Sequence, residues 1–504
     1  MPMFSFPFAL LALPAAGRQV SGSWSTVAAR AGTGAAGAQT GTRRTAVVAA
    51  SATPDPVVII PGIGSNQLEA RLDKPSTVSW TCRKKADWFR LWLSTSELLA
   101  ATSCWADNIK LFYDETHDVL SDNAGVETRV PDFGGTGALE ELDPDVPFHA
   151  TAVFRKIVSA MVDAGHKRNL TLRGAPYDFR FAPSSPRGML YIDRLKHLIE
   201  ETAQATGKRV SLLSHSMGCL QALYLLSKQT QEWKNKFIEK WISLAGPFGG
   251  SARHWRLHAS GDNQGLPVDP LVIREEQRSY ETNFWLLPFP LWFGDRVIVS
   301  TPRRNYTTLD YDAFFDDIGY SAGKAMLRRV KALMGAAEAP GVDVVCMYSL
   351  GLDTPDSFSY GKDGFDKQPV AKNSDGDGTV NALSLRVCDQ WENAQASARS
   401  ARVIRFSEVT HSGMLTDDNV LGAVMSELGL PFARASGSQP ASIADVAFTV
   451  FHDAPSIRSN SAAVLGGDGS LTLLEARQGQ KDVLRVKVDP IGVAMSSGDS
   501  AAQD

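Results

Sequence analysis

The sequence lacks several features that would place it in other functional classes. It has 51 Lys and Arg against 55 Asp and Glu, a formal net charge of −4, so no basic field would attract nucleic acid. No apolar run reaches about 18 residues, so no membrane-spanning helix is predicted. The five cysteines form no CxxC pair and show no zinc-ligand spacing. These absences argue against a nucleic-acid partner, a transmembrane anchor and a zinc site.

Acidic residues are also absent from the start of the chain, where Asp55 is the first. The apolar stretch 6–13 ends in small residues and is typical of a secretory signal, although it has no basic n-region. Residues 17–54 are rich in Ala, Gly, Ser and Thr with scattered Arg, a composition that favours disorder. An organelle transit peptide would share these features. We expect 1–54 to be a targeting and low-complexity leader, and we favour entry into the secretory pathway, leading to secretion or to a vacuole or lysosome-like organelle.

The cysteine count is odd, which fits two disulfides and one free thiol in an oxidising compartment. Five buried reduced thiols are the alternative. The cysteine positions alone do not determine which cysteines are bonded to each other. The five positions are Cys82, Cys104, Cys219, Cys346 and Cys388.

The most informative stretch is residues 210–226. The apolar run 210–213 is typical of a buried strand, and a helical pattern begins at Cys219. Between them, residues 214–218 read Ser-His-Ser-Met-Gly, a variant of the nucleophile elbow. Small residues at 214 and 218 permit the sharp turn, which would lift the Ser216 hydroxyl above a sheet, beside the helix N-terminus. The expected strand before this motif and the expected helix after it favour Ser216 as a nucleophile. His215 is expected to have a structural or supporting role.

A Gly-rich turn, residues 61–66, follows the apolar strand 57–60. In α/β-hydrolases such a turn brings one backbone N–H to the substrate oxyanion, and the residue after the nucleophile, here Met217, supplies the second. A phosphate-binding loop is the rival interpretation. It fails because no Gly-Lys-Ser/Thr follows and the spacing is not GxGxxG.

The remaining pattern alternates strands and helices, which predicts a mostly parallel sheet covered on both faces. The expected strands are 169–174, 238–244, 342–350 and 403–406, and the expected helices are 149–164, 188–205 and 415–428.

An acid and a base follow in the order that α/β-hydrolases use. Asp377 is expected just past a strand, and His411 lies on a Gly-containing loop after the last core strand. Residues 373–384 also imitate a calcium loop, but Ser384 stands where the bidentate Glu belongs, so calcium is rejected. The predicted triad is Ser216, Asp377 and His411, a set that needs neither metal nor organic cofactor.

Two segments are unusually aromatic. Residues 80–105 mix Trp, Phe and Leu with Lys and Arg, which suits a lipid headgroup interface, although packing on the core is the alternative. Trp88, Trp92 and Leu93 are the candidate membrane or substrate contacts. Residues 248–305 look irregular and carry the aromatic cluster 284–293, which predicts a lid over an apolar pocket rather than an ordinary packed loop.

The tail, residues 434–504, changes in composition. A strand at 446–451 and a hairpin of 470–474 with 483–488 predict a small β appendage without visible chemistry. The hydrolase domain is therefore predicted to span 55–433.

Several motifs together resemble the family of lecithin–cholesterol acyltransferase and lysosomal phospholipase A, over residues 57–430. They are Asn66–Ala70 with Leu72–Pro75, Leu172–Asp178, Ser214–Gly218, Ala259–Gly265, Ser300–Pro302 with Asn305–Thr307, and Asp375–Val380. The resemblance implies an α/β-hydrolase with a cap and a membrane-binding subdomain. Gly64 and Ser65 depart from the family, which has leucine and glycine at these positions.

The resemblance also implies individual roles. Ser216, Asp377 and His411 fall on the family's triad, and Ile63 and Met217 on its oxyanion backbone positions. Trp92 falls on an aromatic residue implicated in substrate binding. The cysteine positions match disulfides Cys82–Cys104 and Cys346–Cys388 and a free thiol at Cys219.

The expected reaction is phospholipid acyl transfer through a Ser216 ester to water or a lipid alcohol such as a sterol, at a membrane surface and by a monomer. A phospholipid:diacylglycerol acyltransferase is the alternative enzyme, and a non-catalytic lipid-binding scaffold is the distant one. Asn169 and Asn305 begin glycosylation sequons.

Overall fold

The computed structural model describes residues 53–394, 399–432, 461–465, 471–477 and 480–486. Nearly all of the predicted leader and the predicted strand 446–451 lie outside the described residues. Side chains are described only for 53–394 and 399–432. Among these described parts, no helix combines the length and the apolar character needed to cross a bilayer.

A six-stranded sheet forms the centre of the fold, with strand order β15-β12-β9-β8-β1-β7 and parallel pairing throughout. The strands are β1 (Val57–Ile60), β7 (Leu172–Gly174), β8 (Val210–His215), β9 (Ile238–Leu244), β12 (Val344–Leu350) and β15 (Ala401–Ser407). Every residue of β1 and β8 is buried, as expected for parallel strands covered on both faces. The predicted α/β-hydrolase fold is confirmed.

Helices connect these strands, as parallel pairing requires. The longest, α5 (Pro186–Thr206), begins where Ser185 accepts a hydrogen bond from the Gly188 N–H and ends at Gly207, whose φ is 68°. The others outside the segments described below are α3 (Gly137–Glu140), α4 (Arg155–Asp163), α6 (Met217–Lys228), α7 (Gln231–Phe237), α12 (Tyr311–Asp317), α13 (Ala322–Val330), α14 (Ala382–Leu385), α15 (Trp391–Ala394) and α16 (Asp418–Glu427).

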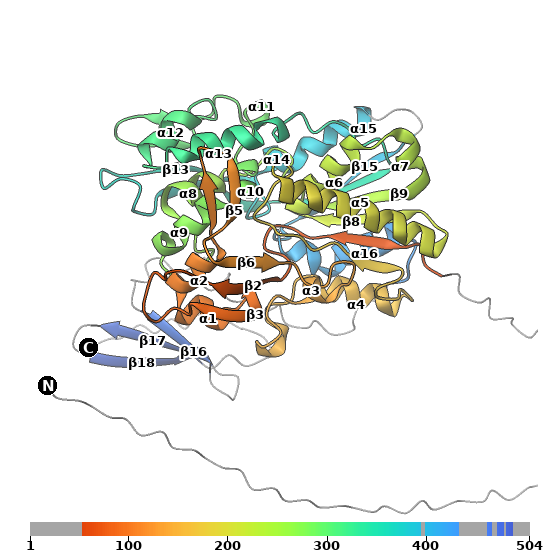
Figure 1. The fold of residues 1–504 in the computed structure, drawn as a ribbon. Coiled ribbons are helices and arrows are strands. Elements are labelled where there is room, and N and C mark those ends of the chain that lie inside the picture. Colours follow the sequence, from red (N-terminus) through yellow and green to blue (C-terminus); the bar gives the residue numbers. More distant parts are fainter. Residues whose placement is uncertain (1–52, 395–398, 433–460, 466–470, 478–479, 487–504) are drawn as a thin grey trace, which may run out of the picture. The chain divides into compact units, whose positions relative to one another are not determined.

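Residues 68–129 form a separate group of elements, here called the disulfide subdomain. Its antiparallel sheet has the order β3-β2-β6, and a hairpin pairs β4 with β5. Figure 1 shows its strands and helices in orange, with β5 standing apart from β2, β3 and β6, toward the green helices. They are β2 (Leu68–Asp73), β3 (Lys85–Trp92), α1 (Thr95–Ala100), α2 (Thr102–Ile109), β4 (Leu111–Asp114), β5 (Val119–Asp122) and β6 (Val126–Arg129).

The segment predicted to be irregular, 248–305, contains four short helices, so that expectation was wrong. They are α8 (Arg253–Ser260), α9 (Pro270–Ser279), α10 (Glu281–Trp285) and α11 (Pro290–Phe293). Asp269 caps α9 through the Leu271 N–H. Most of the aromatic cluster is buried, and Leu291 is its exposed apolar member at 61%. The cluster therefore packs as core within the helical segment 253–293, which is green in Figure 1.

Two further sheets complete the described structure. One has the order β11-β10-β13-β14, with strands β10 (Val299–Ser300), β11 (Asn305–Tyr306), β13 (Leu352–Ser359) and β14 (Val370–Gly376). The other is antiparallel and consists of β16 (Ser461–Leu465), β17 (Leu471–Arg477) and β18 (Gln480–Val486). The last two strands form the hairpin predicted in the tail.

Candidate active site

Ser216 occupies the turn between β8 and α6. Its φ of 54° and ψ of −130° lie in a region that L-residues rarely adopt. The turn is crowded, because a Cβ on Gly218 would lie 2.4 Å from the carbonyl oxygens of Ile60 and Pro61. A glycine at this position therefore allows β8 to turn directly into α6, as the elbow interpretation requires.

His411 contacts both Ser216 and Asp377. Its Nε2 lies 2.8 Å from the Ser216 Oγ, and its Nδ1 lies 2.7 Å from Oδ2 of Asp377. The carboxylate only accepts hydrogen bonds, so Nδ1 carries the proton and Nε2 accepts from the serine hydroxyl. The structure thus brings together three side chains from distant parts of the chain.

Asp377 is held firmly just after β14. Its side chain is fully buried, and Oδ1 accepts hydrogen bonds from the Thr379 N–H at 3.0 Å and the Val380 N–H at 2.8 Å. Oδ2 is thereby left to the His411 ring. Both carboxylate oxygens have partners, which compensates for the burial of the charge.

The Gly-rich turn lies directly against Ser216. A Cβ on Gly62 would lie 2.9 Å from the Ser216 Cβ. Within residues 53–394 and 399–432, neither the Ile63 nor the Met217 backbone N–H has a hydrogen-bond acceptor. Two free donors at this position can stabilise an oxyanion that forms beside the Ser216 Oγ.

Comparison with known proteins identifies the family of this chain. Residues 88–417 match the family model described as lecithin:cholesterol acyltransferase. The lysosomal phospholipase A and acyltransferase of Canis lupus familiaris is 43% identical over 371 residues, which cover 73% of this chain and 89% of that protein. The chain belongs to the lecithin:cholesterol acyltransferase family.

Two other relatives extend the comparison within the lecithin:cholesterol acyltransferase family. The phosphatidylcholine-sterol acyltransferase of Mus musculus is 39% identical, over 73% of this chain and 83% of that protein. The lecithin-cholesterol acyltransferase-like 1 protein of Arabidopsis thaliana is 40% identical, over 74% of this chain and 90% of that protein. The chain is thus similar to relatives from animals and from a plant along most of their length.

The cysteines of this family member form the two bonds that the resemblance implied. Cys82 is bonded to Cys104, and Cys346 to Cys388. Cys219 is free and buried behind the elbow, where its Sγ accepts from the Ser214 hydroxyl at 3.2 Å, and burial raises the pKa of its thiol to about 11. Two disulfides fit an oxidising compartment. Both sequon asparagines, Asn169 and Asn305, are exposed.

The predicted contact residues of the 80–105 segment are only partly exposed. Trp92 packs against Trp105 and Phe179, and its indole N–H donates to the Gly64 carbonyl at 2.7 Å. It therefore holds the Gly-rich turn 61–66 in place. Leu93 packs against the core.

Two arginines lie against Trp88. The Arg71 and Arg129 guanidinium groups stand 5.4 Å and 4.2 Å from its ring centre. The most exposed large apolar side chain of the segment is Trp80, at 93%, followed by Leu99 at 49%, and Val78, just before the segment, is 57% exposed. Composition could place aromatic residues in this segment but could not distinguish which of them face outward.

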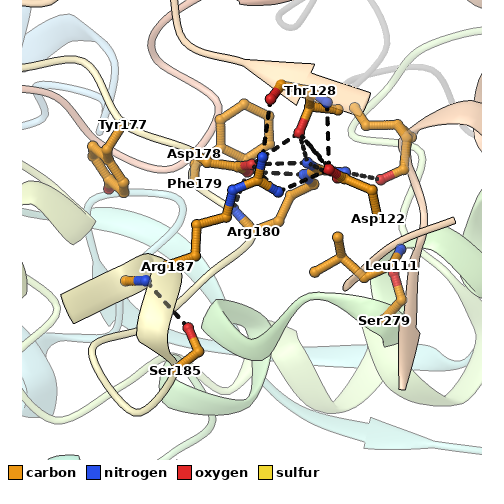
Figure 2. A network of polar contacts seen from close by, with 12 residues as sticks. Leu111, Asp122, Thr128, Tyr177, Asp178, Phe179, Arg180, Ser185, Arg187 and Ser279 are labelled. Atoms are coloured by element: carbon orange, nitrogen blue, oxygen red, sulfur yellow. Dashed lines mark hydrogen bonds and ion pairs between the residues drawn. The ribbon is translucent and has the colours of Figure 1, made fainter. Parts of the chain in front are cut away.

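A buried ionic network, which the sequence did not predict, joins the disulfide subdomain to the hydrolase core (Figure 2). The Arg180 side chain is fully buried. It donates to Asp178 at 2.8 Å, to Asp122 at 2.7 Å and to the Ile109 carbonyl at 2.8 Å. Arg187 also contacts Asp122, at 2.9 Å. Two arginines facing two aspartates balance the buried charge, as buried ion pairs require.

The segment that carries Arg180 also contacts the Gly-rich turn 61–66 and helix α10. The Asn66 side chain, at the end of the Gly-rich turn 61–66, bonds the backbone of Tyr177 in both directions. On the other side, the Thr282 hydroxyl of α10 donates to the Phe179 carbonyl at 2.6 Å. Residues 177–184 therefore form a junction between the core, the disulfide subdomain and the 253–293 helices.

Proposed function

We propose that this chain is a serine acyl-hydrolase and O-acyltransferase that removes a fatty acyl group from a phospholipid ester. The observation that carries the proposal is the hydrogen-bonded series Ser216–His411–Asp377. Among the described residues, the unpaired Met217 N–H follows Ser216 in sequence, and the unpaired Ile63 N–H belongs to the turn packed against Ser216. The names of the relatives supply the substrate class, since these proteins are phospholipases and acyltransferases.

In the first half-reaction, His411 takes the Ser216 proton as the hydroxyl attacks the ester carbonyl carbon. Asp377 holds the imidazole in the Nδ1–H tautomer and stabilises the imidazolium. The carbonyl oxygen becomes an oxyanion on the Ile63 and Met217 N–H groups, each worth about 3 kcal/mol of barrier. The imidazolium then protonates the leaving lysophospholipid oxygen, which leaves an acyl ester on Ser216.

In the second half-reaction, the acceptor hydroxyl gives its proton to His411 as its oxygen attacks the acyl ester. Water yields a free fatty acid, and a lipid alcohol such as a sterol yields a new ester. Proton transfer back to the Ser216 oxygen regenerates the enzyme. The acceptor depends on how far the pocket excludes water, and the 253–293 helices are our candidate for the lid over it.

The enzyme is proposed to act as a monomer on a phospholipid surface within the secretory pathway. Docking through the disulfide subdomain is supported by Trp80 and Val78, whose exposed apolar side chains have Arg83 and Lys84 as charged neighbours in sequence. Such a mixture suits the boundary between headgroups and acyl chains.

The direct test is Ser216→Ala with liposomes of phosphatidylcholine, with and without sterol, followed by analysis of the lipid products. We expect release of lysophospholipid to fall on the order of 10⁵- to 10⁶-fold. Sterol ester, fatty acid or triacylglycerol identifies the acceptor, and triacylglycerol would favour the diacylglycerol-dependent alternative. If the purified variant still released lysophospholipid, the assignment of Ser216 as the nucleophile would be wrong. A native protein that no fluorophosphonate labels would instead be a lipid-binding scaffold.

A further inference from the structure

We propose that His215 is a positioning residue for His411. The imidazole N–H of His215 donates a hydrogen bond to the backbone carbonyl of His411 and so holds the loop that carries the His411 ring. The inference rests on the proposed function, in which Ser216 and His411 perform the chemistry. It concerns how the base is kept in place rather than which groups react.

The loop that carries His411 needs such support. Its neighbours Thr410 and Ser412 are exposed, and an exposed loop is mobile unless its backbone groups are bonded. The His411 N–H donates to the Asp377 carbonyl at 2.9 Å. The His411 carbonyl accepts from the Nε2 of His215, also at 2.9 Å. Thus one backbone group of His411 is held by the triad acid and the other by the residue before the nucleophile.

The geometry fixes the tautomer of His215. A carbonyl only accepts, so Nε2 must carry the hydrogen and Nδ1 must be bare. Within the described side chains, the buried Nδ1 has no hydrogen-bond partner, and the Phe154 ring packs edge-on with its centre 6.3 Å away. Burial, followed by the nearby His411, lowers the pKa of His215 to about 3. The ring therefore stays neutral, and the hydrogen bond persists in acidic as well as neutral solution.

Neutrality also matters because the two imidazoles are close. The centres of the His215 and His411 rings are 4.9 Å apart. A charged His215 would oppose formation of the His411 imidazolium during acyl transfer. The neutral ring supports the base without this penalty.

The chain order makes the support direct. His215 and Ser216 are consecutive, and His215 ends the buried strand β8. The nucleophile and the anchor of the base therefore share one rigid element. A displacement of about 1 Å between reacting groups costs about 100-fold in rate, so loss of the anchor should lower turnover without weakening substrate binding.

The experiment compares His215→Leu, which removes the donor, with His215→Gln, whose amide can reach the same carbonyl. The readouts are kcat and KM on a soluble short-chain ester and the rate of fluorophosphonate labelling of Ser216. We expect His215→Leu to lower kcat and labelling by about 30- to 100-fold with KM within about twofold. His215→Gln should recover most of this loss.

A matched control is His166→Leu. His166 is also buried, bonds one carbonyl, that of Thr171, at 3.1 Å, and has a second ring nitrogen without a partner among the described groups. It should leave kcat and labelling unchanged. If His215→Leu fails to fold, His215→Asn, whose amide falls short of the carbonyl, takes its place with the same expectation.

The inference is overturned if the variants without the donor keep their kcat, if their loss lies in KM, or if His215→Gln is as impaired as they are. Ser216→Ala, assayed in parallel, separates this outcome from failure of the proposed function. An inactive Ser216→Ala beside a fully active His215→Leu defeats only the role of His215, whereas an active Ser216→Ala defeats the underlying mechanism.

Discussion

At the scale of single residues, the candidate site depends on the hydrogen bonds made by the buried carboxylate of Asp377. Asp377 is completely buried, yet both of its oxygens are bonded, one to two backbone N–H groups and one to His411. Such a carboxylate has one orientation available. Its task in the proposed mechanism is to select one histidine tautomer, and this gives a sharp prediction.

Asp377→Asn should lower kcat by about 10⁴-fold with little change in fold, because an amide of the same shape favours the wrong tautomer of His411. The measurement is kcat on a soluble ester, together with the thermal melting curve. Asp375→Asn is the matched control, since the exposed Asp375 side chain accepts a hydrogen bond only from the Gly351 N–H, at 2.7 Å, among the described groups. Equal losses in the two variants would deny Asp377 its role.

Glu276, on α9, gives a prediction about pH. Burial raises its pKa from 4.5 to about 8, although Tyr280 and Arg180 oppose the shift. Between these values the unfolded chain has lost the proton that the folded protein keeps. The free energy of unfolding should therefore fall by about 1.4 kcal/mol per pH unit as pH rises through this window, while buried neutral histidines such as His215 act in the opposite sense below about pH 6.5.

Glu276→Gln should remove this dependence, so the stability difference between variant and wild type should change steadily from about pH 5 to pH 8. Urea unfolding at several pH values measures it. Comparing each variant with wild type cancels the contribution of the histidines. Glu275→Gln is the control, because the Glu275 side chain is 63% exposed. Parallel curves for wild type and Glu276→Gln would show that the burial of Glu276 has no effect on its ionisation.

What could be predicted at this scale follows from how local each signal is. The elbow, the oxyanion turn and the loop of His411 each have a pattern within a few residues, so Ser216 and His411 could be placed from the sequence. The bond between Arg180 and Asp122 spans 58 positions, and no local pattern announces it. The same holds for Trp80 and Trp88, whose difference in exposure depends on what packs against them.

At the scale of elements, long periodic segments were predicted best. The strand 238–244 has the bounds expected, and α5 begins two residues earlier than expected and ends one residue later. The 253–293 helices escaped notice because each has ten residues or fewer, and glycine or proline separates α8 from α9 and α10 from α11. A helix of that length shows too few turns for a clear period.

The disulfide subdomain gives the prediction at this scale. Trp80→Ala should weaken binding to phosphatidylcholine liposomes by roughly tenfold, because an exposed indole contributes about 1–2 kcal/mol when buried in the interface. Hydrolysis of a soluble ester should be unchanged. Liposome co-sedimentation and ester assays measure the two effects.

Trp88→Ala serves as the matched control, since Trp88 is only partly exposed and the guanidinium groups of Arg71 and Arg129 lie over its ring. It should bind liposomes nearly as well as wild type. If Trp88→Ala weakened liposome binding more than Trp80→Ala, the lipid contact would lie at Trp88 on β3 and not at Trp80.

At the scale of the whole molecule, the two disulfides should have different consequences. The bond Cys346–Cys388 joins central strand β12 to the segment before α15 and closes a loop with a sequence separation of 42. Its replacement by Cys346→Ser with Cys388→Ser should lower the free energy of unfolding by about 4 kcal/mol. Urea unfolding of the complete protein measures this effect.

The comparison is Cys82→Ser with Cys104→Ser, which opens a loop with a separation of 22 inside the disulfide subdomain. Here we expect liposome binding to suffer more than hydrolysis of a soluble ester. If both pairs change only global stability, the subdomain has no independent part in lipid contact.

The junction at residues 177–184 has a consequence for how the enzyme fails on warming. This short segment contacts Asn66 of the Gly-rich turn 61–66, Asp122 of the disulfide subdomain and Thr282 of α10. If either peripheral part detaches, the segment loses a constraint while the parallel sheet keeps its own hydrogen bonds. Turnover should therefore cease at a temperature below the calorimetric transition, and brief heating followed by cooling should restore it.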